Sequence, residues 1–98
     1  MIETINNAGR YAPVIKCDVC GKQITDAEMA LALYPVNVEG GSVPTLHVHK
    51  GVCDRKASAA QGDEGGTDEL DTYLYYLMHN AGVSFDRAKS KADMLSLL

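Results

Sequence analysis

The apolar positions of the chain follow a strand-like pattern in its first half and a helical pattern in its second half. Leu31 and Leu33 alternate with alanines within residues 29–38, and residues 43–49 form a second extended run after a turn at 39–42. Alternation with a period of two is typical of a half-buried strand. Two such runs on either side of a Gly-Gly turn predict a β-hairpin with strands near 29–38 and 43–49.

Residues 26–34 also carry a helical signal that conflicts with the first of these strands. Thr25 and Glu28 stand three residues apart in front of an apolar run, which is the spacing of a helix capping box. The extended character of the sequence continues beyond Pro35, and this favours the strand. We therefore expect a strand and keep a helix over 26–34 as the alternative.

The second half of the chain predicts three helices. The first lies within 51–61, is rich in alanine and ends at Gly62, and residues 62–66 have the composition of a linker. Residues 67–98 hold two rows of apolar residues at helical spacing, separated by Asn80-Ala81-Gly82. The rows are Leu70, Tyr73, Leu74, Leu77 and Ala81, and then Phe85, Ala88, Ala92 and Leu95 after Ser84 as a cap. We expect a helical hairpin over 67–98 that packs on the preceding part of the chain.

The start of the chain has fewer structural signals. Residues 1–10 are polar in character, with Asn6-Asn7 and Gly9, and we expect a flexible arm over 1–12. A short extended run then leads into the first cysteine, and Pro13 limits it to an edge strand or to the start of a strand. A length of 98 residues with 46% hydrophobic composition fits one small α+β domain with a thin core.

The three cysteines and two of the three histidines lie between residues 17 and 53. Cys17 and Cys20 are separated by two residues and followed by Gly21, which can adopt the positive φ of a tight turn that points both sulfurs at one spot. His49 and Cys53 are placed just before and within the first turn of the predicted 51–61 helix. Thiolates and imidazole are the ligands that structural zinc prefers, in sets of four. The sequence therefore predicts a Zn²⁺ site with the ligands Cys17, Cys20, His49 and Cys53.

Other interpretations of these residues are weaker. An odd number of cysteines cannot form a complete disulfide framework, and a redox CxxC normally opens a helix, whereas Gly21-Lys22 suits a turn. His47 shares a strand face with His49 and is the alternative ligand, or else a hydrogen-bonding neighbour of the metal site. His49 is preferred because it stands nearer the start of the helix.

The order Cys-Cys-Gly, hairpin, His-Cys resembles treble-clef zinc fingers, and the ligand order Cys17, Cys20, His49, Cys53 is similar to one half of a LIM domain. The motifs CDVCG and HVHKGVC also resemble small, uncharacterised bacterial zinc proteins of the CxxCG…HVHK…C type. The resemblance covers about residues 13–60 and implies a zinc-bound knuckle, hairpin and helix as one module over 13–61. LIM modules occur in pairs, and the chain has a single ligand set.

Composition narrows the cellular setting. The formal net charge is −4, which argues against a protein that coats nucleic-acid duplexes. The first residues do not resemble a signal peptide, and no apolar run approaches the length of a membrane span. Reduced cysteines without an export signal indicate the cytoplasm. Five basic residues lie near the metal motif: Lys16, Lys22, Lys50, Arg55 and Lys56. They either form a solvated face that offsets the thiolate charge or make a small patch that binds an anionic ligand.

We expect a non-enzymatic protein-interaction module with structural zinc, because four protein ligands leave the metal no open position for water. Tyr73, Tyr75 and Tyr76 give the 67–81 helix an apolar surface wider than one face, so they are the expected interface with another part of the chain, another protein or a second copy. A nucleic-acid-binding zinc finger is the second candidate. An HNH-nuclease relative is the third, since His47 resembles the first histidine of that motif but no matching Asn and His follow Cys53.

Overall fold

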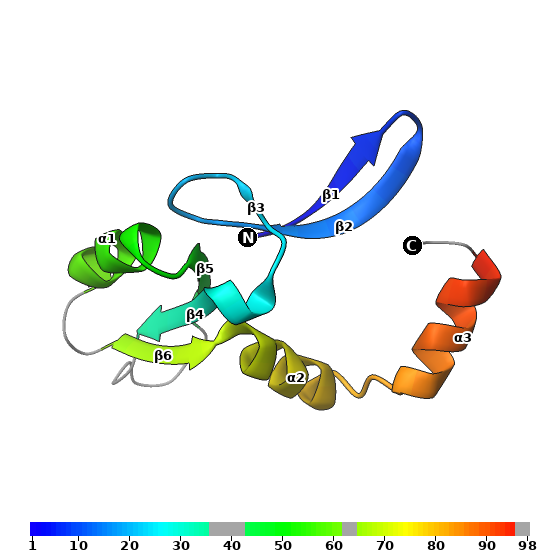
Figure 1. The fold of residues 1–98 in the computed structure, drawn as a ribbon. Coiled ribbons are helices and arrows are strands. Elements are labelled where there is room, and N and C mark those ends of the chain that lie inside the picture. The colour runs from blue at the N-terminus through cyan, green and yellow to red at the C-terminus, as the bar shows by residue number, and fades with distance from the viewer. Residues whose placement is uncertain (36–42, 62–64, 96–98) are drawn as a thin grey trace.

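The computed structural model describes residues 1–35, 43–61 and 65–95 and has an α+β architecture of two small antiparallel sheets and three α-helices (Figure 1). One sheet has the strand order β1-β2-β3 and the other the order β5-β4-β6. The elements are β1 (Ile2–Asn7), β2 (Arg10–Lys16), β3 (Gln23–Ile24), the 3-10 turn η1 (Ala27–Met29), β4 (Ala30–Pro35), β5 (Leu46–His49), α1 (Val52–Gln61), β6 (Gly65–Glu69), α2 (Leu70–Asn80) and α3 (Phe85–Leu95).

The first sheet includes residues that the sequence predicts as a flexible arm. β1 pairs with β2 along its whole length, from Ile2 opposite Ile15 to Asn7 opposite Arg10. The connecting residues Ala8 and Gly9 both have positive φ, of 54° and 84°, as a two-residue hairpin turn requires. The expectation of a flexible arm over 1–12 is therefore wrong, because a tight turn lets the two segments satisfy each other's backbone groups.

The second sheet resolves the conflict over residues 26–34. Asp26 caps a single 3-10 turn by accepting the N–H of Glu28 at 3.0 Å, and strand β4 then begins at Ala30. The strand prediction is confirmed over 30–35 and the helix alternative is wrong, because Ala30 and Ala32 are fully buried on the inner face of the sheet. β5 covers the end of the predicted 43–49 strand, whereas residues 36–42 lie outside the described part of the chain.

β6 occupies a segment whose composition predicts a linker. Gly65 and Gly66 pair with Pro35 and Tyr34 of β4, while residues 62–64 lie outside the described residues. A side chain at Gly66 would overlap the ring of Tyr34, so glycine is what lets the strand approach this closely. Because the strand runs to Glu69, α2 begins at Leu70, later than the predicted hairpin, which starts at 67.

The core lies where the two sheets and two of the helices meet. Its largest fully buried side chains are Leu33, Leu70, Val48 and Cys17. Leu70, with Tyr73 and Leu74, brings α2 against this core, and Ala57 brings α1. One candidate metal ligand is thus part of the hydrophobic core itself. Within the described residues, no helix is long and apolar enough to cross a membrane.

The two C-terminal helices form, but they do not build the predicted hairpin. Ser84 caps α3 as expected, accepting the N–H of Arg87 at 3.4 Å. α3 has no buried residue and stands apart from the sheets in the view of Figure 1. For the described residues, the expectation that 67–98 folds into a hairpin packed on the body is wrong, because the start of that segment pairs with β4 as a strand and α3 buries no residue.

Candidate metal centre

The first two candidate ligands are held by a turn between β2 and β3. The N–H of Cys17 donates to the carbonyl of Lys22 at 2.8 Å, and the N–H of Gly21 donates to the carbonyl of Cys17 at 2.9 Å. Gly21 has a φ of 75°, the left-handed conformation that the CxxCG motif predicts. The turn also aims backbone amides at sulfur, since the N–H of Val19 donates to Cys17 Sγ at 3.4 Å.

The other two candidate ligands come from the junction of β5 and α1. His49 is the last residue of β5, and Cys53 is the second residue of α1. Gly51 joins them with a φ of 91°, and its carbonyl accepts the N–H of Arg55 at 2.9 Å, which starts the helix. Cys53 therefore sits in the first helical turn, where the helix dipole favours a thiolate.

The structure brings these four side chains together into a Cys₃His cluster. The donor atoms of Cys17, Cys20, His49 and Cys53 all lie within 4.8 Å of one another, and Cys20 Sγ is 3.4 Å from His49 Nδ1. A tetrahedral zinc ion with Zn–S bonds of about 2.3 Å has ligand atoms about 3.6–3.8 Å apart. The spacing and the donor types therefore fit a single four-coordinate metal ion.

The protonation of the thiols reflects their crowding. Burial raises the pKa of Cys17, but hydrogen bonds from the backbone of Cys20, His49 and Val19 outweigh it and lower that pKa to about 6. Burial, followed by the hydrogen bonds and negative charge of Cys17 and Cys20, raises the pKa of Cys53 to about 11. Ionisation of one thiol disfavours ionisation of its neighbours, and a bound dication would offset that repulsion.

His47, the alternative ligand, lies outside the cluster. Its side chain is buried, and its Nδ1 is 2.7 Å from the amino group of Met1 and 3.6 Å from Asp18 Oδ2. Burial and then the charge of that amino group lower the pKa of His47, against the opposing effect of Asp18. His47 thus belongs to a hydrogen-bonded group beside the cluster, and His49 is the histidine that faces the sulfurs.

The sequence reasoning missed Asp18 as a residue that organises the site. Asp18 Oδ2 accepts the N–H of His47 at 2.7 Å and lies 3.1 Å from the Met1 amino group. These contacts join the first cysteine turn to β5 and to the start of the chain. The pairing of β1 with β2, which brings Met1 to this place, had no signal that the sequence reasoning recognised.

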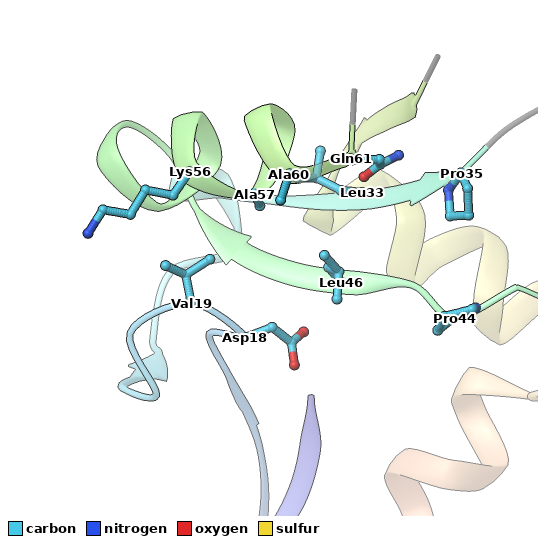
Figure 2. Close-up of a pocket in the computed structure, with 10 residues that line it drawn as sticks. All are labelled: Asp18, Val19, Leu33, Pro35, Pro44, Leu46, Lys56, Ala57, Ala60 and Gln61. Atoms are coloured by element: carbon cyan, nitrogen blue, oxygen red, sulfur yellow. The ribbon is translucent and has the colours of Figure 1, made fainter. Parts of the chain in front are cut away.

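A cleft next to the cluster was also absent from the sequence reasoning. It has a volume of about 490 Å³ and lies between the cysteine turn, β4, β5 and α1 (Figure 2). Its lining is mostly apolar and comes from Asp18, Val19, Leu33, Pro35, Pro44, Leu46, Lys56, Ala57, Ala60 and Gln61. Val19 sits between the first two cysteines, so the proposed ligand loop forms one wall of the cleft.

The three tyrosines of the expected interface separate into two groups. Tyr73 is partly buried, stacks on Tyr34 with ring centroids 6.1 Å apart, and shares a 2.9 Å hydrogen bond with Thr45. Tyr75 and Tyr76 are exposed and contact each other, and Tyr75 also stacks on Phe85 at 6.4 Å. Only Tyr73 therefore meets the part of the chain that carries the metal ligands.

Comparisons of the chain with protein-family models, with curated proteins and with solved structures find no match. The likeness to treble-clef, LIM and bacterial zinc proteins consequently rests on the motif residues, and the geometry that accompanies it is the Cys₃His cluster.

Proposed function

We propose that the protein is a small zinc-binding module in which the metal is structural and the surface beside it binds another protein. The observation that carries this proposal is the convergence of Cys17, Cys20, His49 and Cys53 from two separate parts of the fold. A metal ion bound there ties the β2–β3 turn to the β5–α1 junction, and metal binding becomes part of the folding free energy.

Zinc is the metal that these donors favour. Three thiolates and an imidazole are soft and borderline ligands, and a set of four such donors is typical of structural zinc sites. The full set of four protein ligands is also the basis for proposing that the protein is not an enzyme. A catalytic zinc keeps one position open for water, whereas four protein donors would fill every position of a tetrahedral ion here.

The cleft beside the cysteine turn is the candidate protein-binding surface (Figure 2). Its walls are mainly apolar, and its size suits a short protein segment that inserts two or three apolar side chains. Two basic residues near the cluster are already in ion pairs, Lys16 with Glu3 and Lys50 with Glu69, at 3.0 Å each. That pairing weakens the case for a basic nucleic-acid-binding face.

The metal part of the proposal is tested by elemental analysis of the purified protein. We expect one zinc per chain, and we expect Cys17→Ser, Cys20→Ser and Cys53→Ser each to lose the metal and to unfold residues 13–61. Ser58→Ala on α1 is a control that leaves the cluster intact and should keep the zinc. Protein without zinc, with two of its thiols joined in a disulfide, would contradict the proposal.

The binding part is tested with a matched pair of substitutions on one helix. Ala60 lines the cleft, whereas its exposed neighbour Ala59 does not. A partner protein captured by the wild type should be lost with Ala60→Glu and retained with Ala59→Glu, with zinc content unchanged in both variants. Equal capture by both variants would place the binding surface elsewhere, and capture of nucleic acid in place of protein would favour the zinc-finger alternative.

A further inference from the structure

The cleft beside the cysteine turn is open because α1 presents small side chains to it. Ala57 and Ala60 line the cleft from α1, whereas Leu33 and Leu46 line it from β4 and β5. A larger side chain at either alanine would occupy part of the cleft volume of about 490 Å³. Folded proteins normally fill such apolar space with their own side chains, so a cleft kept open by alanines is a candidate for a ligand.

The length of the cleft matches a short piece of extended chain. Lys56 and Gln61 line its two ends from α1 (Figure 2), and the helix rises about 7.5 Å between them at 1.5 Å per residue. Two residues of an extended strand span about 6.6–6.8 Å, and side chains two positions apart point to the same side. An extended segment would therefore insert two apolar side chains that are separated by one residue.

The polar side chains that line the cleft differ in whether they already have partners. Asp18 Oδ2 accepts the N–H of His47 at 2.7 Å, and Gln61 Nε2 donates to the carbonyl of Tyr34 at 2.6 Å. Lys56 is exposed, and it forms no ion pair or side-chain hydrogen bond with any other residue that the structure describes. The cleft therefore offers a cation to an incoming ligand at the Lys56 end.

The position of the ammonium group determines where a carboxylate can meet it. Figure 2 shows the side chain of Lys56 at one end of the cleft, with its amine pointing away from the other labelled residues. Lysine commonly lays its carbon stem along apolar surface and keeps its charge in water. A carboxylate that pairs with Lys56 must therefore lie just outside the apolar part of the cleft, next to the inserted apolar side chains.

We infer that the cleft recognises an extended segment of a partner protein in which two aliphatic residues, separated by one residue, stand directly beside an Asp or Glu. This inference rests on the proposed function of the cleft as a protein-binding surface and adds the sequence that the cleft selects. Burial of the aliphatic pair supplies most of the affinity, and the carboxylate at Lys56 sets the orientation of the segment. A basic residue in place of the acid would be repelled by Lys56.

The first test is selection from a random peptide library displayed on phage, with the zinc-loaded protein immobilised. We expect the selected peptides to share two aliphatic residues, one residue apart, with Asp or Glu beside them. Replacing that acid by its amide in a synthetic peptide should weaken binding about two- to fivefold, the range of an exposed ion pair, and by less at high salt. Selected peptides without an acidic preference, or with apolar residues three or four apart as in a helix, would overturn the inference.

Two charge reversals on α1 test the role of Lys56 in binding the same peptide. Lys56→Glu should weaken binding about fivefold or more, and a peptide with Lys in place of its acid should recover the loss. Arg55→Glu makes the same change in net charge at an exposed neighbour that does not line the cleft, and should change binding less than about twofold. Equal effects of the two variants would overturn the inference, because the net charge of the surface would then account for the acidic preference.

Ala60→Leu separates failure of this inference from failure of the proposed function. The larger side chain fills part of the cleft, so peptide binding should be lost while the zinc content is kept and the melting temperature does not fall. If Ala60→Leu abolishes binding but Lys56→Glu behaves like Arg55→Glu, the inference is wrong and the cleft is still a protein-binding surface. If no peptide is selected, if the selected peptide binds Ala60→Leu as tightly as the wild type, or if dodecanoate displaces it at lower concentration than free peptide, both are wrong.

Discussion

Asp18 and His47 are joined by two hydrogen bonds that run in opposite directions. The N–H of Asp18 donates to the carbonyl of His47 at 2.8 Å, and the N–H of His47 donates to Asp18 Oδ2 at 2.7 Å. Asp18 follows Cys17 directly, and His47 is two residues before His49 on β5. The pair therefore ties together the two arms of the Cys₃His cluster.

Substitution of Asp18 should weaken the fold through the lost side-chain acceptor. Asp18→Ala leaves the N–H of buried His47 without its partner, at a cost of about 1–3 kcal/mol in the free energy of unfolding. Asp18→Asn keeps an oxygen at the same position and should lose much less. Chemical unfolding of the zinc-loaded proteins measures both values. Equal losses would mean that the carboxylate acts through its charge beside the Met1 amino group rather than through this hydrogen bond.

Replacing His47 and replacing His49 should have different effects on zinc binding. His49→Ala deletes the only imidazole of the cluster and should lower zinc affinity by orders of magnitude, with loss of structure because the metal contributes to folding. His47→Ala removes a buried ring outside the cluster and should keep one zinc while lowering stability. Zinc content after dialysis, together with a thermal melt, distinguishes the two. Retention of zinc by His49→Ala and its loss from His47→Ala would reverse the assignment.

The parts of the site that could be predicted from the sequence are those whose structure depends on neighbouring residues in the chain. Cys17-x-x-Cys20-Gly21 specifies its own turn, because glycine at that position permits the positive φ that the structure has. The helix that carries Cys53 also follows from local signals. The convergence of these two pieces on one point was inferred from the ligand preferences of zinc, and the structure brings all four residues together.

The errors of sequence reasoning come from pairing between distant residues. β6 contains two glycines and two acidic residues, which strands usually avoid, and it exists because the edge of β4 was free to pair with it. The hairpin of β1 and β2 depends on a turn at Ala8-Gly9, which looked like flexible polar sequence. The apolar row of α3 predicted a helix correctly, but the row alone could not tell which surface it faces.

Tyr34 should give the protein a distinct response to alkaline pH. Its hydroxyl donates to Asp68 Oδ2 at 2.9 Å, and this hydrogen bond, followed by burial, raises the pKa of Tyr34 above its ordinary 10.0. A raised pKa in the folded state means that the stabilisation is fully present below pH 10 and is lost as the pH rises through the higher folded value.

The comparison that measures this effect is Tyr34→Phe against the wild type in chemical unfolding at a series of pH values. We expect the wild type to be more stable by about 1–2 kcal/mol at neutral pH, with the difference shrinking only above pH 10. Tyr11→Phe removes an exposed hydroxyl from the β1–β2 sheet and serves as the control. A difference that already falls between pH 7 and 9 would point to another titrating group.

Gly66 and Gly65 should differ in their tolerance of alanine, although they are neighbours on the same strand. A methyl group at Gly66 would overlap the ring of Tyr34, whereas one at Gly65 would meet the side chain of Gln61. The ring is held by its hydrogen bond to Asp68 and its stacking on Tyr73, so moving it would break both contacts. Gln61 is a flexible side chain whose amide donates to the carbonyl of Tyr34 and can rotate away.

Gly66→Ala should therefore lower the free energy of unfolding by about 1–3 kcal/mol, the usual cost of overpacking, and Gly65→Ala by less than that. Because β6 leads directly into α2, a displacement of β6 by Gly66→Ala should also weaken the contacts of α2 with β4. Thermal unfolding of the two zinc-loaded variants measures the difference, and the fluorescence of the tyrosines follows the change near Tyr34. If Gly66→Ala is as stable as the wild type, β6 does not pair with β4 in the register that sets Gly66 opposite Tyr34, because only that register places the glycine against the ring.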